Sequence, residues 1–266
     1  MVGTPKRRGP RTERDFRRRE LSQNFLRPSA ADLFVSHLTH LDREVMLVEV
    51  GAGSGVLTER LASTFSQVVA YEIDPEVATT LGARVSRHSN VTIVVSDFTA
   101  APPPSARFNL VGNVPFSRTA DIVRWCLDAS NIQSATLITQ LEYARKRTGA
   151  YGRWSKLTIT MWPEWDWRLL DKVPSRGFRP EPRVDGGILL LERRPRPLLD
   201  STLMKRYRSL VDLGFLGVGG SLHSSLRRRF PRPVVDRAFR SAGVELTRVV
   251  GYVTPDEWLR IVQGLG

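Results

Sequence analysis

The chain has 266 residues, of which 41% are hydrophobic and 25% are charged. This length and apolar content suffice for one large domain with a buried core and a small appendage. The formal net charge is +13, which favours a polyanionic partner because basic side chains release counterions from nucleic acid phosphates. No run approaches the roughly 18–20 apolar residues of a membrane span, so the sequence predicts no contact with a membrane.

The only cysteine of the sequence, Cys126, falls in an apolar helical pattern. A single cysteine excludes an internal disulfide, and we interpret it as a core residue of a cytoplasmic protein. We also find no cluster of metal ligands, and the four histidines are scattered.

Residues 1–20 contain eight Lys and Arg residues and almost no apolar ones. Such a segment buries too little surface to order itself, so it is predicted to be a flexible basic arm that contacts RNA phosphates. A solvated tail is the alternative. Acidic residues interrupt the arm and no apolar stretch follows it, so neither a secretory signal nor a transit peptide is expected.

A helix is predicted over residues 29–41, followed by a buried parallel strand over residues 45–50. The strand ends in Gly51-Ala52-Gly53-Ser54-Gly55, and helical spacing resumes over residues 56–65. Strand, glycine turn and helix in this order bring backbone close to a ligand. Val56 stands where the dinucleotide fingerprint needs its third glycine, which disfavours a dinucleotide oxidoreductase. A G-x-G-x-G turn after Glu49 is typical of S-adenosylmethionine binding; a merely tight turn is the alternative.

Two acidic residues follow the next two predicted strands. Residues 68–71 lead to Glu72, and residues 91–95 lead to Asp97. A carboxylate at the second strand tip can accept both hydroxyls of a ribose, and Asp97 can accept from an adenine amino group. Either acid could instead be a surface charge or a helix cap, and Asp74 before Pro75 is predicted to be such a cap.

The strand predicted over residues 108–111 delivers Asn113-Val114-Pro115-Phe116 to the same edge of the sheet. The side-chain oxygen of Asn113 and the backbone carbonyl of Val114 are two acceptors for an exocyclic NH₂ group. Phe116 offers a ring on which a base can stack. An ordinary turn with a core phenylalanine is the alternative.

Beyond this segment, a helix is predicted over residues 119–127 and a fifth strand over residues 135–139. Basic and aromatic residues then interleave over residues 145–156, a mixture that grips phosphates and stacks bases, although a solvated helix end would look similar. Three tryptophans alternate with polar residues and are predicted to pack a strand. The basic residues predicted to contact RNA are Arg145, Lys146, Arg147 and Arg153. The tryptophans predicted to pack the strand are Trp162, Trp165 and Trp167.

A stiff loop over residues 177–184 precedes an apolar strand over residues 188–191. Its ring, Phe178, is predicted to cover the second face of a flipped base. Residues 193–197 look like a linker, and residues 198–266 are predicted to form three or four short helices. Arg227 and Arg228 in that region are further candidates for RNA contact.

Six motifs occur in one order along nearly the whole chain. They are residues 22–26 (SQNFL), 49–55 (EVGAGSG), 72–74 (EID), 97–98 (DF), 113–116 (NVPF) and 178–184 (FRPEPRV). With these motifs the chain resembles the rRNA adenine N6-methyltransferases, and most closely the erythromycin-resistance methylases of actinobacterial type. Many relatives carry Tyr where Phe116 stands; stacking survives this change, so activity is expected.

The resemblance implies a Rossmann-like α/β methyltransferase domain over residues 21–194 and a small helical, RNA-contacting domain over residues 195–266. It also implies a monomer whose substrate is one adenine of 23S rRNA in the peptidyl-transferase loop, and resistance to macrolide, lincosamide and streptogramin B drugs. Two other activities remain open: a housekeeping dimethyltransferase of small-subunit rRNA, and a non-catalytic nucleic-acid-binding relative. The residues implied to line the S-adenosylmethionine site are Asn24, Leu26, Gly51, Glu72, Asp97 and Asn113, with Phe116 stacked on the target adenine.

Overall fold

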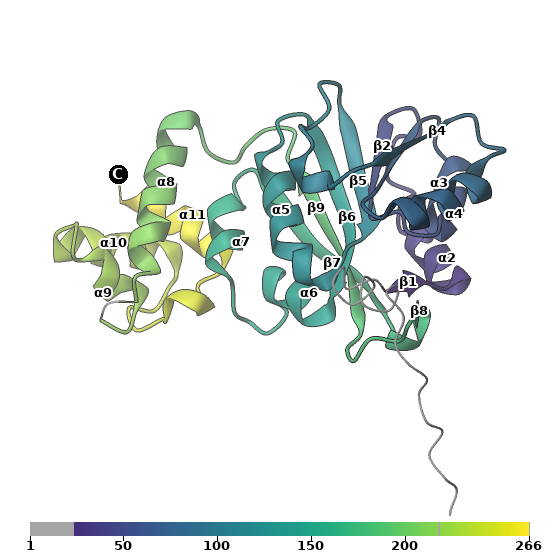
Figure 1. Ribbon diagram of the computed structural model, residues 1–266. Coiled ribbons are helices and arrows are strands. Elements are labelled where there is room, and N and C mark those ends of the chain that lie inside the picture. The colour runs from purple at the N-terminus through teal and green to yellow at the C-terminus, as the bar shows by residue number, and fades with distance from the viewer. Residues whose placement is uncertain (1–23, 218, 266) are drawn as a thin grey trace, which may run out of the picture.

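The computed structural model describes residues 24–217 and 219–265 (Figure 1). The basic arm predicted over residues 1–20 and the first two residues of the SQNFL motif lie outside this range. A sheet flanked by helices forms one part of the molecule, and a group of helices near the C-terminus forms the other (Figure 1).

Among the described residues, seven strands form the central sheet in the order β4-β3-β2-β5-β6-β9-β7. β4, β3, β2, β5 and β6 are parallel, and β9 runs antiparallel to both of its neighbours, β6 and β7. This arrangement confirms the Rossmann-like α/β fold. The strands are β2 (Met46–Val50), β3 (Val68–Glu72), β4 (Val91–Val95), β5 (Phe108–Asn113), β6 (Ile132–Gln140), β7 (Trp165–Val173) and β9 (Gly186–Arg193).

Apolar side chains cover both faces of the sheet because successive residues of a strand point to opposite sides. In β2, Leu47 packs into the core formed with α2 (Pro28–Ser36) and α3 (Val56–Ala62). Its neighbour Val48 packs into the core formed with α5 (Thr119–Asp128) on the opposite face. Helices therefore sandwich the sheet, and α4 (Pro75–Val85) packs beside β3 and β4.

The predicted elements recur with small shifts at their ends. β4 spans the five residues expected, and Asp74 caps α4 by accepting the backbone N–H groups of Glu76 and Val77, as predicted. The first helix is shorter than predicted because α2 ends at Ser36. From there the chain makes tighter turns, with the N–H of His37 bonded to the carbonyl of Phe34.

A two-stranded sheet joins segments that lie far apart in the sequence. β1 (Phe25–Leu26) pairs antiparallel with β8 (Phe178–Arg179). The described residues of the SQNFL motif and the FRPEPRV motif therefore lie side by side, next to the start of α2 (Figure 1).

The helical part has its own apolar core. Its helices are α8 (Ser201–Gly214), α9 (Leu222–Leu226), α10 (Arg232–Ala242) and α11 (Pro255–Gly264). α7 (Lys156–Met161) joins this core although it precedes β7, and the hydroxyl of Tyr207 donates to the carbonyl oxygen of Ile159 at 2.8 Å. The domain boundary at residue 194 stays a prediction. α7 precedes that boundary in the chain, yet it contributes to the core of the helices that follow it.

Two of the three alternating tryptophans pack a strand as predicted. Trp165 and Trp167 are buried in β7. Trp162 lies outside that strand, at the end of α7, and its indole N–H donates to Asp256 at 3.1 Å. Within residues 24–217 and 219–265, every helix is too short or too polar to cross a bilayer.

Candidate active site

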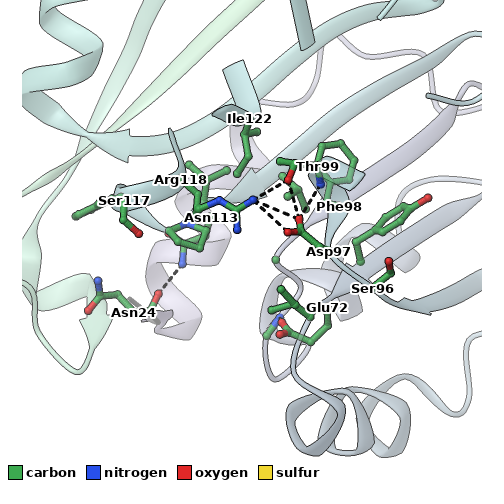
Figure 2. A pocket seen from close by; sticks show the side chains of 18 of the residues that line it. Asn24, Glu72, Ser96, Asp97, Phe98, Thr99, Asn113, Ser117, Arg118 and Ile122 are labelled. Carbon is green, nitrogen blue, oxygen red and sulfur yellow. Dashed lines mark hydrogen bonds and ion pairs between the residues drawn. The ribbon is translucent and has the colours of Figure 1, made fainter. Parts of the chain in front are cut away.

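The carboxyl ends of β2, β3, β4 and β5 surround a cavity (Figure 2). Open parallel sheets bind ligands at this end. The cavity encloses about 930 Å³ of space free of protein atoms, open solvent at its mouth included. Most of the predicted cofactor and catalytic residues line it: Asn24, Gly51, Glu72, Asp97, Asn113, Val114 and Phe116.

The glycine turn after β2 supplies backbone to the cavity. Gly51 and Gly53 have φ angles of 71° and 58°, a conformation that residues with side chains rarely adopt. A Cβ atom on Gly53 would lie 2.9 Å from Cδ1 of Phe25, so a side chain has no room there. The N–H of Gly53 donates to Oε2 of Glu72 at 2.8 Å, which ties the turn to the tip of β3.

Glu72 is 3% exposed, and both of its oxygens accept backbone N–H groups, from Gly53 and from Asp74. Burial raises the pKa of Glu72, and these hydrogen bonds oppose that rise without cancelling it. Each carboxylate oxygen has a second lone pair. Glu72 can therefore hold the turn and still accept hydroxyl groups from a ligand in the cavity.

Asp97 caps a short 3₁₀ helix, η1 (Phe98–Ala100). Its Oδ1 accepts the backbone N–H and the hydroxyl of Thr99 at 2.9 and 2.8 Å, and its Oδ2 lies 3.2 Å from the Arg118 guanidinium. Burial raises the pKa of Asp97, but the hydrogen bonds from Thr99 and Arg118 outweigh it and hold the pKa below its usual value. Asp97 is thus both a cap and an ionised acceptor in the cavity wall.

Asn113 ends β5 beside the glycine turn. Its side-chain NH₂ donates to the backbone carbonyl oxygen of Asn24 at 2.6 Å, so its Oδ1 is the atom left to accept a hydrogen bond from a ligand. Gly112 makes this position possible, because a Cβ atom there would lie 2.3 Å from the carbonyl oxygen of Val50. Val114 follows, 2% exposed, with its N–H directed at the carbonyl oxygen of Ile138.

Phe116 opens the 3₁₀ helix η2 (Phe116–Arg118) and is half-buried in the cavity wall. The ring of Phe178 meets it edge to face, with 6.4 Å between centroids. Phe178 itself is fully buried, so it braces Phe116 from the core and presents no open face to a base. Leu26 is likewise a core residue and does not line the cavity.

The predicted RNA contacts fall into two groups. α6 (Leu141–Arg147) follows β6 directly, so Arg145 and Lys146 lie at the carboxyl edge of the sheet, as the cavity does. Arg147 is half-buried, lies over the ring of Tyr143 and donates to the hydroxyl of Ser155, which makes it a support for the turn after α6.

The remaining basic candidates belong to the junction and to the helical part. Arg153 is exposed and lies over the ring of Tyr252, 5.4 Å from its centroid. Arg227 and Arg228 are exposed at the end of α9, within the helical part and away from the strands that surround the cavity (Figure 1).

Several residues of the cavity wall were not predicted from the sequence. Arg118 is the clearest case, because it carries a charge and follows Phe116 by two residues. Its place in the cavity wall could have been predicted from the sequence, since a turn that brings Phe116 to the site also brings the residues next to it. Also missed were Phe25, Ile73, Ser96 and Thr99. The described residues contain no group of three His, Cys, Asp or Glu residues placed to hold a metal ion.

Glu49 lies next to the glycine turn, 1% exposed, and its Oε2 has no hydrogen-bond partner among the described residues. Burial raises its pKa to about 7, and the charge of Glu72 adds to the rise. Since the folded state holds this proton more tightly than the unfolded chain does, stability should fall as pH rises from about 4.5 to 7. An uncharged amide would escape that loss.

We therefore predict that Glu49→Gln gains stability relative to the natural chain as pH is raised from 5 to 8, by about 2–3 kcal/mol. Chemical denaturation at the two pH values measures the difference. Glu44→Gln, the same substitution at an exposed position nearby, is the matched control and should track the natural chain. A constant difference between Glu49→Gln and the natural chain would show that Glu49 does not titrate in this range.

Comparisons with known proteins bear on this site. Residues 14–265 match the family model described as ribosomal RNA adenine dimethylase. An rRNA adenine N-6-methyltransferase of Streptomyces fradiae is 53% identical over 93% of this chain and 78% of its own length. One from Saccharopolyspora erythraea is 46% identical over 96% of this chain and 67% of its own length.

A solved structure agrees with the family model and with the two relatives. The crystal structure of the 23S rRNA methyltransferase ErmE superposes with a TM-score of 0.86 at 45% identity, covering 91% of this chain and 99% of that one. The resemblance inferred from the motifs is confirmed. The chain belongs to the ribosomal RNA adenine dimethylase family and is an rRNA adenine N6-methyltransferase.

Proposed function

We propose that this protein transfers a methyl group from S-adenosylmethionine to N6 of a single adenine in the peptidyl-transferase loop of 23S rRNA. It would act as a monomer in the cytoplasm, and the methylated ribosome would resist macrolide, lincosamide and streptogramin B drugs. The observation that carries the proposal is one cavity that joins the glycine turn, two carboxylates and Asn113 to Phe116.

The cavity suits S-adenosylmethionine on the chemistry of its wall. The turn at Gly51 and Gly53, with φ angles that side chains rarely adopt, brings backbone to the cavity wall. Glu72 retains lone pairs for the ribose hydroxyls, and Asp97 is an ionised acceptor for the adenine amino group. When bound, S-adenosylmethionine supplies an electrophilic methyl group on sulfur. The backbone of Asn24, which Asn113 fixes by a hydrogen bond, forms part of the same wall.

The protein itself contributes to the reaction by positioning the adenine base and its N6 atom. The N6 lone pair of adenine is delocalised into the ring, and hydrogen bonds from its NH₂ to Oδ1 of Asn113 and to the carbonyl of Val114 would draw the nitrogen toward tetrahedral geometry. Phe116 would stack on the base after it leaves its helix. Because the acceptors are held by β5 and by Asn24, they need little reorganisation as charge develops on N6.

Mass spectrometry of rRNA fragments tests the proposal most directly. The protein is incubated with 23S rRNA and S-adenosylmethionine, and a mass gain of one or two methyl groups is expected in a single fragment of the peptidyl-transferase loop. Primer extension on small-subunit rRNA is the parallel arm. A methyl group found there, and none in 23S rRNA, would establish the housekeeping alternative instead.

The position of α6 leads to a prediction about RNA binding. Lys146→Gln removes an exposed positive charge near the carboxyl edge of the sheet, so it should weaken binding of a 23S rRNA hairpin and reduce the salt dependence by about one counterion. Arg227→Gln removes an equally exposed charge from the helical part and is the matched comparison. Filter binding at several salt concentrations measures both, and an effect confined to Arg227→Gln would place the RNA on the helical part.

A further inference from the structure

Arg118 joins the two halves of the cavity. It lies at the end of η2, two residues after Phe116, and its Nη2 donates to Oγ1 of Thr99 at 2.6 Å and to Oδ2 of Asp97 at 3.2 Å (Figure 2). Thr99 completes the set, since its hydroxyl accepts from Arg118 and donates to Oδ1 of Asp97. Three side chains from two separate turns thus form one hydrogen-bonded ring.

The two oxygens of Asp97 are used differently in this ring. Oδ1 accepts both the N–H and the hydroxyl of Thr99, with Arg118 more distant at 3.4 Å. Among the residues that the structure describes, Oδ2 accepts only from Arg118. Since a carboxylate oxygen carries two lone pairs, Oδ2 keeps one for a ligand, and Arg118 fixes the direction in which it points.

Arg118 is equally well connected to the segment that bears Phe116. Its backbone N–H donates to the carbonyl of Pro115 at 2.9 Å, and the hydroxyl of Thr119 donates to the carbonyl of Phe116 at 3.1 Å. Hydrogen bonds therefore tie residues 115–119 together, and the Arg118 guanidinium extends from this segment to Asp97.

We propose that Arg118 is a positioning residue that couples the cofactor subsite at Asp97 to the base-stacking segment at Phe116. The inference rests on the proposed function, because it takes S-adenosylmethionine and an adenine of RNA as the two ligands. A ligand amino group bound at Oδ2 of Asp97 would stabilise the hydrogen-bonded ring of Asp97, Thr99 and Arg118. Through Arg118 it would also fix the position of Phe116. By linkage, occupation of either subsite then raises the affinity of the other.

Removal of Arg118 should leave the fold intact, because α5 and η1 are also joined elsewhere. The indole N–H of Trp125 donates to the carbonyl of Ala101 at 3.1 Å, and the rings of Phe98 and Trp125 lie 4.3 Å apart. The Arg118 side chain is 38% exposed, so its loss opens no buried cavity. Variants of Arg118 are therefore expected to melt as the natural chain does.

The first experiment measures binding of S-adenosylhomocysteine by calorimetry without RNA. Arg118→Met should weaken it about tenfold, the effect of losing one charge-assisted hydrogen bond. Arg118→Lys should fall between, because a single ammonium cannot hold Asp97 and Thr99 in one fixed geometry. Asp121→Asn is the control: Asp121 pairs with Arg118 at 3.6 Å but does not line the cavity, so affinity should stay within about twofold.

The second experiment measures coupling, which a merely structural residue would not alter. The affinity of a 23S rRNA hairpin is determined with and without S-adenosylhomocysteine. The natural chain should bind the hairpin at least about fivefold more tightly with the cofactor product, and in Arg118→Met that ratio should approach one.

The outcomes separate the role of Arg118 from the proposed function. Affinity for S-adenosylhomocysteine unchanged in Arg118→Met, or a coupling ratio that is the same in both proteins, overturns the role of Arg118 and leaves the proposed function standing. A natural chain that binds no S-adenosylhomocysteine refutes the proposed function, and this inference with it.

Discussion

Asn113→Ala is expected to abolish methyl transfer to rRNA while the protein stays folded. The substitution removes the Oδ1 acceptor from the cavity wall, and it also frees the backbone of Asn24, whose carbonyl accepts from Asn113 at 2.6 Å. Because the reaction depends on holding N6 in line with the methyl group, the rate should fall by about a hundredfold or more. Tritiated-methyl incorporation measures the rate, and thermal melting checks the fold.

The same strand provides a matched control. Asn109 lies four residues before Asn113 in β5, is 2% exposed and accepts a hydrogen bond from Ser134 at 2.8 Å, and it does not line the cavity. Asn109→Ala should cost about 1–3 kcal/mol of stability, yet the folded protein should keep its turnover. If Asn113→Ala retained the natural rate, Asn113 would have no part in catalysis.

Phe116→Ala should cost far more activity than Phe116→Tyr. Stacking of a base on an aromatic ring contributes about 1–3 kcal/mol, which corresponds to about 5- to 160-fold in rate when the stacking positions the base for reaction. Tyrosine preserves the ring and its edge-to-face contact with Phe178 at 6.4 Å, so its activity should stay near that of phenylalanine.

Single-turnover rates with a 23S rRNA hairpin separate the Phe116 variants. The alanine variant should also bind the hairpin more weakly, since it loses the platform on which the flipped base rests. Equal losses in the alanine and tyrosine variants would count against stacking and would point instead to a steric requirement at this position.

The sequence predicted the parts of the site that depend on strand ends. Buried parallel strands appear as short apolar runs, and the one or two residues after each run lie at the edge where ligands bind. That rule alone locates Glu72, Asp97 and Asn113, and all three line the cavity. The role of Asp74 was predicted from another local signal, because an aspartate before a proline commonly caps the start of a helix.

What the sequence did not reveal depends on contacts between distant segments. The pairing of Phe25 and Leu26 with Phe178 and Arg179 joins residues about 150 positions apart, and short strands carry no periodicity that specifies a partner. Phe178 was expected to face the base, but its burial depends on that pairing. The contact between Arg118 and Asp97 was hidden for a related reason, since only the folded chain brings the guanidinium against that carboxylate.

The packing of α7 against the C-terminal helices affects how a chimaera of such enzymes can be built. Ile159 is fully buried in the core of the C-terminal helices, and the N–H of Trp154 donates to the carbonyl of Gly251 at 2.7 Å. A chimaera that replaced only residues 195–266 with those of a relative would confront α7 with foreign side chains. An exchange that preserves this core would therefore have to carry the stretch around residues 153–162 along with the C-terminal helices.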